Sequence, residues 1–362
     1  MTGLDQSPLY IFHLKADFLV MKKIRACIVT TVRNPGSFFG SFLRYHRAIG
    51  FERIYVFFDD PKDPSQETAK AVAGVKVILC DRKYKLKIRT LRNYSEVKLI
   101  LDTEVTARQE LNVEMALGFA KKEGFDWMFH IDADELIYNS FKRPIGEVLA
   151  KIPDEVEQVV CHNHEAVPQY MDIGNPFLDV TIFKKNIFSL GKLSKAKNAA
   201  LHDSFVDQGR PYFFAYNHGK SGVRVRPHVT PHGVHNFGRF PIKKEQPPLP
   251  SAHIGELVVY HYPSCGFVQY LEKYRLVNPA EARWWKGAKR IGFHKVSTDA
   301  YLEKDFRKLE DLYKNNIQFS DNTTVAKLIK AGLMEKNTFM SNLIKKLHSR
   351  YLISKRRGKI AS

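Results

Sequence analysis

The stretch Trp127-Met128-Phe129-His130-Ile131-Asp132-Ala133-Asp134-Glu135 decides the fold class that this sequence predicts. Its apolar first half is typical of a buried β-strand, and three carboxylates follow within four residues. Carboxylates crowded at the end of a strand repel one another unless a cation lies among them. Because ligands bind at the carboxyl ends of strands in open α/β sheets, we expect a functional site at this strand end.

Asp132 and Asp134 are the residues of this stretch that we expect to hold a metal ion. Side chains alternate along an extended strand, so these two would point to the same side. Two carboxylates at that spacing suit Mg²⁺ or Mn²⁺, with the phosphate oxygens of a substrate completing the coordination shell. The alternative is a plain strand-to-loop transition in which both acids are solvated.

The elements before this strand predict an α/β fold with a mixed, mostly parallel sheet flanked by helices. Residues 24–32, 53–58 and 75–80 are rich in β-branched and aromatic residues, as buried strands are. Asn34 is predicted to cap the helix after the first strand. Residues 106–109 have the form of a capping box and open a second helix, which leads directly into the acidic strand.

The rest of the chain predicts a less regular half followed by helices. Residues 82–92 are expected to form a basic loop before the acidic strand. After Glu135, strand-like runs are separated by polar stretches that contain Gly and Pro, at 158–162, 178–183, 223–226 and 257–262. Helical periodicity returns from Ser264 and predicts a helical C-terminal extension at residues 291–362.

The chain of 362 residues carries a formal net charge of +19, so an anionic partner is expected. That partner is a phosphorylated substrate, an anionic membrane surface or a nucleic acid. Seven Lys and Arg residues and no acid lie between Lys345 and Lys359, interleaved with apolar residues. This basic tail is typical of a peripheral contact with anionic lipid, and a solvated, frayed tail is the alternative.

Targeting signals and cysteines favour a cytoplasmic protein. No apolar run reaches the roughly 18 residues of a membrane-spanning helix. Polar residues interrupt the stretch Leu9–Val20, which argues against a signal peptide. The four cysteines are far apart, and the first three lie in strand-like runs, so reduced and buried thiols are expected.

Several ordered motifs over roughly residues 24–275 resemble the family-2-like glycosyltransferases and the related family 92. The first is Asn34-Pro35, a Phe-rich helix with Tyr45-His46 and Gly50, then Arg53–Asp59, where the family has Asn-Glu and later Asp-Asn. The central block of the family is matched by Arg108-Gln109, Asn112, Asp126-Trp127 and Ile131–Glu135. Its later segments are matched by Gly219–Val225, Gly233-Val234-His235 and His261-Tyr262.

This resemblance implies a GT-A fold and a sugar transfer that uses Mn²⁺ or Mg²⁺. The donor would be a nucleotide-sugar, a UDP- or GDP-sugar, and the acceptor a hydroxyl of a glycan or of a lipid-linked molecule. Residues 22–290 would form the glycosyltransferase domain, with the nucleotide-sugar-binding half at 22–138 and the acceptor half at 139–290. Residues 291–362 would be the helical extension with the basic tail.

The resemblance also implies roles for individual residues. Asp134 would hold the divalent ion together with Asp132, and His261 would be a further ligand, with His235 as a second candidate. The resemblance does not name a general base; if the transfer is inverting, our candidate is Glu165, which follows the predicted strand at 158–162, with Asp203 behind it. Lys220 and Arg224 would contact phosphate. The remaining donor-binding candidates follow the strand ends or begin the second helix: Thr31, Arg33, Asn34, Asp59, Asp60, Arg108 and Asn112.

The alternative function is a basic nucleic-acid-binding protein with a nuclease- or phosphatase-type Asp-x-Asp metal site. A nucleic-acid-binding protein would gather Lys and Arg with aromatic residues on one face. The positive charge here is spread over loops and the tail, and the sequence has no helix-turn-helix, RNA-binding or zinc motif, which argues against nucleic acid. Phosphatases of the haloacid-dehalogenase type carry Asp-x-Asp after their first strand, whereas here it follows about the fourth.

Overall fold

The computed structural model describes residues 10–11, 23–140, 142–242, 246–276 and 292–360, and the chain divides into two compact units. Unit 1 comprises Met1–Ala133, Ile137–His162 and His218–Val259. Unit 2 comprises Asp134–Leu136, Asn163–Asn217 and Tyr260–Ser362. The predicted division into a donor half, an acceptor half and an extension stays a prediction.

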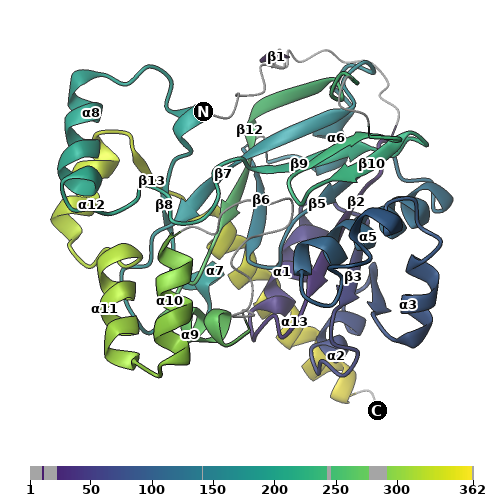
Figure 1. The fold of residues 1–362 in the computed structure, drawn as a ribbon, viewed down its shortest axis with the longest axis horizontal. Coiled ribbons are helices and arrows are strands. Elements are labelled where there is room, and N and C mark those ends of the chain that lie inside the picture. Colours follow the sequence, from purple (N-terminus) through teal and green to yellow (C-terminus); the bar gives the residue numbers. More distant parts are fainter. Residues whose placement is uncertain (1–9, 12–22, 141, 243–245, 277–291, 361–362) are drawn as a thin grey trace. The chain divides into compact units, whose positions relative to one another are not determined.

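Unit 1 contains a mostly parallel sheet, as the sequence predicted. Its strands follow the order β1-β12-β7-β9-β5-β2-β3-β4 (Figure 1). The bounds are β1 Tyr10–Ile11, β2 Ala26–Val32, β3 Arg53–Phe58, β4 Val75–Leu79, β5 Trp127–His130, β7 Gln158–Ala166, β9 Lys220–Arg224 and β12 Ser251–His261. The neighbours β5, β2, β3 and β4 are all parallel, and β9 runs antiparallel to both β5 and β7. The acidic strand β5 is therefore central.

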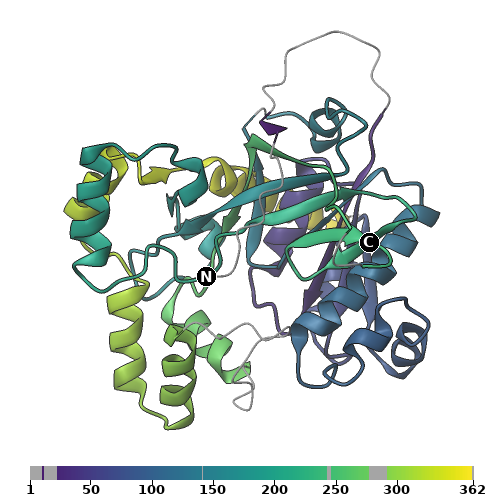
Figure 2. The ribbon, with the colours of Figure 1, turned by 45° about the horizontal axis from the view of Figure 1, so that its top comes forward.

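Helices cover both faces of the parallel strands in unit 1. The α-helices are α1 Phe39–Ala48, α2 Gln66–Lys70, α3 Arg82–Ile88, α4 Tyr94–Val97, α5 Val105–Lys122 and α6 Ile145–Leu149. Phe39 of α1 packs edge-on against Phe58, whereas Phe119 of α5 packs against Tyr55. Tyr55 and Phe58 are three residues apart in β3, so they face opposite sides of the sheet. The hairpin of β10 (Val229–His232) and β11 (Asn236–Arg239) lies beside α5 (Figure 2).

Three local predictions in unit 1 were wrong. Asn34 does not cap α1, because its φ is 50° and the helix begins only at Phe39. Thr106 does not open α5, which begins one residue earlier without a side-chain cap. Residues 82–92 are not simply a loop, since α3 occupies their first part. The Asp81 carboxylate accepts the Tyr84 N–H and caps that helix at its start.

Unit 2 combines short strands with helices. Strand β8 (Ile182–Lys184) pairs with β13 (Met334–Lys336) and with the end of β7. The predicted strand at 178–183 is instead α7 (Pro176–Asp179) followed by β8, because Asn175 caps a helix that begins at Pro176. The remaining strand of the fold is β6 (Glu135–Asn139), which begins in unit 2. The other α-helices are α8 Lys195–Leu201, α9 Phe267–Leu276, α10 Gly292–Leu302, α11 Phe306–Asn316, α12 Asn322–Lys330 and α13 Phe339–Ile360.

Two hydrophobic clusters stabilise unit 2. Phe205, Phe319 and Leu328 belong to one, and Tyr270 and Tyr313 to the other. The predicted helices of the C-terminal extension are present, with β13 as a short addition between α12 and α13. These C-terminal helices supply side chains to both clusters, so the extension is part of the core of unit 2.

Helix α13 carries most of the predicted basic tail. Lys345, Lys346 and Arg350 are exposed on it. Over the residues that the structure describes, no helix combines the length and the apolar character needed to cross a membrane. The peripheral lipid contact of the tail stays a prediction.

The four cysteines are free and buried, as predicted for reduced thiols. Burial raises the pKa of the Cys80 thiol and of the Cys161 thiol to about 12. Both groups are therefore protonated at neutral pH and are poor nucleophiles.

Candidate functional site

Helix α5 ties together the polar side chains at the carboxyl ends of neighbouring parallel strands in unit 1. Arg108 forms a bidentate pair with Asp59, which follows β3, over distances of 2.7 Å (Nε to Oδ1) and 3.1 Å (Nη2 to Oδ2). The next residue, Gln109, donates through Nε2 to the Oδ1 atom of Asp132, which follows β5, over 2.8 Å. Three predicted residues, Asp59, Arg108 and Asp132, thus lie at one edge of the sheet together with Gln109.

The same helix reaches the end of β2 one turn later. Asn112 is fully buried and donates through Nδ2 to the hydroxyl of Thr31 over 2.8 Å. Its Oδ1 atom accepts a hydrogen bond of 2.5 Å from the Tyr84 hydroxyl. Residues 108 and 112 are four apart and so share one face of α5. With Gln109 next to Arg108, side chains of this one helix therefore contact the ends of β2, β3 and β5.

Lys220, the first residue of β9, supplies a buried positive charge to Asp132. Its side chain is 1% exposed, and Nζ lies 2.7 Å from the Oδ2 atom of Asp132. Burial alone would raise the pKa of the Asp132 carboxyl, but the Lys220 ammonium outweighs it and holds that pKa well below its usual range. Asp132, whose side chain is 32% exposed, is therefore a carboxylate at all physiological pH values.

Two neutral imidazoles lie close to this ion pair. Burial lowers the pKa of His130 and of His235 to about 3, and the charge of Lys220 adds to the effect at both. The Nδ1 atom of His235 is 2.9 Å from the Gly219 carbonyl. The buried Nε2 atom of His130 has no hydrogen-bond partner within the described parts of the chain. The Lys220–Asp132 pair thus lies beside uncharged ring nitrogens.

Gly219 explains how Lys220 enters this position. Its φ is 75°, and a Cβ atom on it would lie 2.2 Å from the carbonyl oxygen of Cys161 in β7. Only glycine tolerates both the left-handed conformation and this close approach. A side chain here would push the start of β9 away from β7 and would displace Lys220.

Unit 2 carries a second pair of predicted residues. The Oδ2 atom of Asp134 is 3.6 Å from the Nε2 atom of His261, the last residue of β12. Burial would lower the pKa of His261, but the Asp134 carboxylate outweighs it and raises that pKa. The Tyr262 N–H donates to the Asp134 carbonyl over 2.9 Å and fixes the backbone of the pair. The structure thus brings these two predicted metal ligands together.

Glu135 lies in the same unit and is fully buried. It accepts a short hydrogen bond from the Tyr216 hydroxyl, and the Tyr216 ring lies 4.8 Å from the ring of His261. The Nδ1 atom of His261 is buried and, over the described residues, has no hydrogen-bond partner. Tyr216 therefore lies against both Glu135 and the His261 ring, while Nε2 of His261 is the ring nitrogen near Asp134.

The donor set of Asp134 and His261 suits a divalent ion, since carboxylate oxygen and imidazole nitrogen both bind Mn²⁺. Across the described residues, no group of three or more His, Cys, Asp and Glu side chains is arranged as a metal site. One structural premise of the sequence prediction was wrong. Strand β5 ends at His130, and Asp132 and Asp134 lie in the turn before β6, so strand alternation does not fix where they point.

The predicted general bases lie in different surroundings. Glu165 is fully buried, forms a short ion pair with Lys184, and accepts backbone N–H groups from Phe214 and Ala215 at 3.3 Å and 3.0 Å. Asp203 is 55% exposed and pairs with Lys327 over 2.9 Å on the surface of unit 2. The contacts of Glu165 are those of a structural ion pair, and its catalytic role stays a prediction.

The other residues predicted to contact the donor either lie near the surface or form structural contacts with the backbone. Arg33 and Asn34 are exposed, and the Asn34 N–H donates to the Asp63 carboxylate over 2.6 Å. Asp60 is half-buried and accepts the Lys62 N–H at 2.9 Å. Arg224 donates to backbone carbonyls of residues 152, 153 and 156, so its contacts are structural.

Sequence reasoning missed several residues of these clusters. Gln109 is adjacent to Arg108 in the motif that carried the family resemblance, and this position was the available signal. Tyr84 lies in a segment predicted to be a loop, and no local pattern connects it to Asn112. The roles of Tyr216 and Lys184 depend on contacts across 81 and 19 residues of chain, respectively, and have no local signature.

Comparison with known proteins indicates a transferase. No protein-family model matches the chain. Two Arabidopsis thaliana proteins, each named glycosyltransferase-like, are similar to it. One is 27% identical over 342 residues, which are 90% of this chain and 73% of that protein. The other is 29% identical over 257 residues, which are 66% of this chain and 48% of that protein, so the chain spans about half of its length.

Solved structures with some likeness include nucleotide-sugar enzymes. The crystal structure of glucosyl-3-phosphoglycerate synthase from Mycobacterium tuberculosis, in complex with Mn²⁺, UDP and glucosyl-3-phosphoglycerate, is 11% identical with a TM-score of 0.29. The match covers 60% of this chain and 65% of that one. Mouse xyloside xylosyltransferase 1 is 14% identical with a TM-score of 0.23, covering 38% of this chain and 51% of that one.

Proposed function

We propose that this chain is a metal-dependent glycosyltransferase that moves a sugar from a UDP- or GDP-sugar to a hydroxyl of a glycan or a lipid-linked acceptor. The two glycosyltransferase-like relatives support the reaction class. The observation that carries the proposal is the array that α5 gathers at the carboxyl ends of β2, β3 and β5. That edge of a parallel sheet is where nucleotides bind in α/β proteins.

In this proposal the array binds the donor. Gln109 and Lys220 hold the Asp132 carboxylate in place, and in this position it would accept hydrogen bonds from ribose or sugar hydroxyls. Asp59, held in place by Arg108, and Thr31, held by Asn112, line the neighbouring strand ends. Arg33, Asn34 and Asp60 follow β2 and β3 and would contact the nucleotide from the exposed side.

Asp134 and His261 would hold Mn²⁺ or Mg²⁺. Such an ion, when bound, stabilises the negative charge that develops on the departing nucleoside diphosphate. Asp134 suits this role better than Asp132, because the charge of Asp132 is already neutralised by Lys220. Asp134 also stands only two residues after Asp132 in the chain.

The proton of the acceptor hydroxyl needs a base if the transfer inverts the anomeric centre. Glu165 can serve only if Lys184 moves away from it, since their ion pair occupies the carboxylate. We therefore propose that Glu165 positions the Phe214–Ala215 backbone. A Glu165→Gln variant that keeps its turnover and its pH profile, but unfolds more readily, would agree with that role.

A nucleotide-sugar screen tests the proposed function. The wild-type chain is incubated with UDP- and GDP-sugars, with and without Mn²⁺, and released UDP or GDP is measured. Metal-stimulated release is expected with one donor, and Asp134→Ala should abolish it. Asp299→Ala, at an exposed acid of α10 that pairs with Lys295, is the matched control and should leave release unchanged. Turnover that persists in Asp134→Ala, or nuclease activity without any donor, would refute the proposal.

A further inference from the structure

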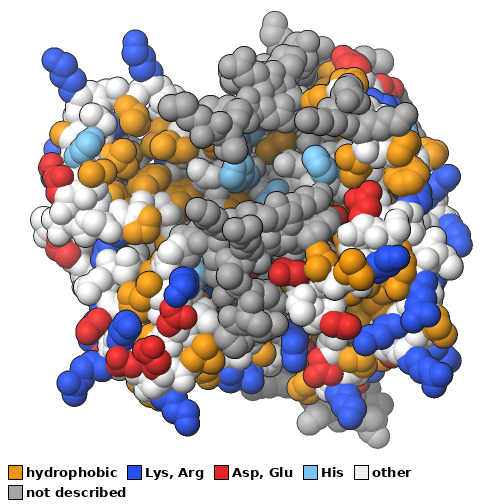
Figure 3. Space-filling model, viewed as in Figure 1, with side chains coloured by type: hydrophobic (Ala, Val, Ile, Leu, Met, Phe, Trp, Pro, Cys, Tyr) orange, Lys and Arg blue, Asp and Glu red, His pale blue; other side chains and the backbone are white. Residues whose placement is uncertain are grey.

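The segment at residues 82–99, which we call the basic segment, exposes a dense group of cations on unit 1. It contains a single acid, Glu96. Its exposed cationic side chains are Arg82, Lys83, Lys85, Lys87, Arg89, Arg92 and Lys98. Figure 3 shows Lys and Arg side chains interleaved with hydrophobic ones over the region of α3 and α5 (right of the view). Such a charge density calls for an anionic partner.

The same surface exposes large apolar side chains. Leu99 is 90% exposed and Leu86 is 57% exposed, both within the basic segment. Over the described residues of unit 1, the other large hydrophobic side chains with high exposure are Val105, Phe240 and Ile242. Leu86 and Leu99 contribute little to the core, and they belong to the same segment as the cations, a combination that is typical of an interaction surface.

Arg92 joins the two stretches of chain that carry these residues. Its Nη1 and Nη2 atoms donate to the carbonyls of Pro227 and Val229 over 3.1 Å and 3.0 Å. Its guanidinium lies over the Phe240 ring at 4.7 Å. The basic segment and residues 227–242 therefore form one continuous surface. Arg226 and Arg239 extend it, and they share the single carboxylate of Glu157.

We propose that this surface binds the face of an anionic lipid bilayer. Cations attract anionic headgroups, and aliphatic side chains such as Leu86 and Leu99 enter the boundary between headgroups and acyl chains. Single-stranded nucleic acid would instead require exposed aromatic rings on which bases stack. Phe240 is the one exposed aromatic residue of the group, and Arg92 covers its ring. The mixture of aliphatic residues and cations thus favours lipid.

Vesicle co-sedimentation of the full chain tests the proposal. We expect binding to phosphatidylcholine vesicles that contain phosphatidylserine, little binding without it, and weaker binding as salt rises. Reversing three charges, Lys83→Glu, Lys85→Glu and Arg89→Glu together, should weaken binding by about a hundredfold or more, because each cation near the surface contributes about fivefold. Lys87 is left unchanged, since it also packs over Phe119.

Apolar variants separate insertion from attraction. Leu86→Ser with Leu99→Ser should weaken vesicle binding about tenfold and leave its salt dependence intact. The matched control is Leu302→Ser in unit 2, at a leucine that is 55% exposed, and it should bind as the wild type does. All these side chains are exposed, so circular dichroism should show unchanged folding.

Three results would overturn the proposal. The first is vesicle binding that survives the triple charge reversal but is lost in Lys345→Glu with Lys346→Glu on α13, since binding would then belong to the tail. The second is equal binding of the wild type to vesicles with and without phosphatidylserine. The third is binding of single-stranded polynucleotide that depends on Lys83, Lys85 and Arg89 while vesicles are not bound.

Discussion

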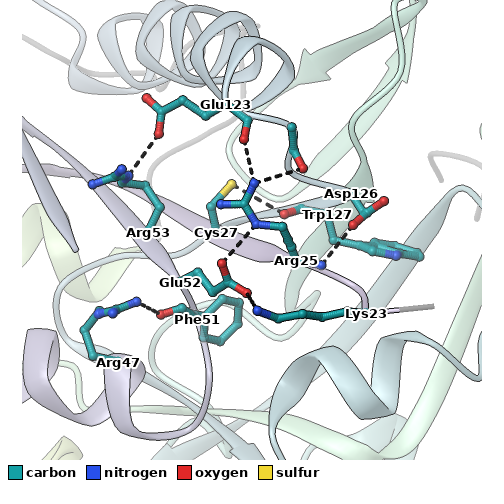
Figure 4. A network of polar contacts seen from close by, with 11 residues as sticks. Lys23, Arg25, Cys27, Arg47, Phe51, Glu52, Arg53, Glu123, Asp126 and Trp127 are labelled. Atoms are coloured by element: carbon teal, nitrogen blue, oxygen red, sulfur yellow. Dashed lines mark hydrogen bonds and ion pairs between the residues drawn. The ribbon is translucent and has the colours of Figure 1, made fainter. Parts of the chain in front are cut away.

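The parallel strands of unit 1 end differently at their two edges. At the amino ends, Figure 4 shows a network of ion pairs among half-buried side chains. Arg25, just before β2, bonds to Glu52 over 2.9 Å, and Arg53, at the start of β3, bonds to Glu123 over 3.0 Å. Their side chains are 25% to 36% exposed. At the carboxyl ends, by contrast, the ammonium of Lys220 is 1% exposed.

The ion pairs at the two edges differ in their contribution to stability. Exposed ion pairs each contribute roughly 0 to 1 kcal/mol, and together they fix the entry of three strands at little cost. A buried ammonium costs several kcal/mol in lost hydration, and its partner only offsets that cost. The Lys184–Glu165 pair is buried as well and is structural, so burial alone does not distinguish the two edges. We propose that Lys220 and Asp132 serve function because they lie at the carboxyl ends of the strands, and that the ion pairs of the amino edge serve structure.

The largest expected contrast is between the two aspartates that flank β5. Asp132→Asn removes the charge that we propose contacts the donor, so transferase turnover should fall about a hundredfold or more. Asp126→Asn, at the amino end of the same strand, removes a carboxylate that accepts the Arg25 N–H, and turnover should stay within about twofold. Nucleotide release with a saturating donor measures both. Equal losses in the two variants would end the functional distinction between the edges.

The next contrast lies within the carboxyl-edge pair. Asp132→Asn removes the carboxylate that pairs with the buried ammonium of Lys220 and should destabilise the fold by about 3 kcal/mol. Lys220→Met leaves a carboxylate that is 32% exposed and can be hydrated, so about 1 kcal/mol is expected. Urea unfolding of both variants measures the difference. If Lys220→Met were the more costly, the lysine would be the stabilising member and our account of the pair would be wrong.

The sequence predicted the strands and the helix that form the two edges, because these elements follow local patterns. The strands at residues 53–58 and 127–130 have apolar runs of strand length, and α5 has a helical one, so each was found within a few residues. Helix α3 was missed because its Lys-rich composition hides two buried side chains four residues apart, Tyr84 and Ile88. The start of α1 was misplaced because the conformation of Asn34 depends on Asp63, which is 29 residues away.

The candidate site was predictable only in part, for the same reason. Asp132 and Asp134 follow a strand and are predicted from their spacing, and the order of the motifs predicts Lys220 and His261, whose functional roles stay predictions. The partner of each residue is a long-range choice: Lys220 reaches Asp132 across 88 residues of chain, and Asn112 reaches Thr31 across 81. Local patterns carry no information about such pairs, so the division of charge between Asp132 and Asp134 emerged only with the structure.

Acid titration gives a smaller contrast, between exposed carboxylates and a buried imidazole. His46 is neutral in the fold, since Nε2 accepts the Ile137 N–H over 3.2 Å and Nδ1 bonds to the Phe42 carbonyl over 2.9 Å. Burial lowers the pKa of His46 to about 3. Protonation therefore favours the unfolded chain, and the stability from His46 is complete above about pH 6.5 and lost as pH falls towards 3.

The amino-edge carboxylates lose their contribution only at lower pH. Partial burial raises the pKa of Glu52 and Glu123, but hydrogen bonds from Arg25 and Lys76, respectively, outweigh it and lower both values. Their contribution to stability is present above the pKa of about 4.3 in the unfolded chain and is lost below it.

Between about pH 6.5 and 5, His46 is therefore the group of this comparison that takes up a proton on unfolding. His46→Gln should reduce that proton uptake by about one, which changes the free energy of unfolding by about 1 kcal/mol at pH 5.5. The free energy of unfolding is measured by urea unfolding at several pH values. If its dependence on pH were the same in His46→Gln and in the wild type, this expectation would be wrong.

The smallest effect is expected at the amino edge itself. Glu123 is shared by two cations, Arg53 over 3.0 Å and Lys76 over 2.9 Å, so removing one leaves the carboxylate still paired. Arg53→Met should cost about 0.5 kcal/mol, Lys76→Met about the same, and neither should change turnover. A double-mutant cycle of Arg53 and Glu123 measures the pair itself. A coupling above about 2 kcal/mol, or a loss of activity in Arg53→Met, would mean that this edge also carries a functional charge, since exposed pairs alone do not reach that value.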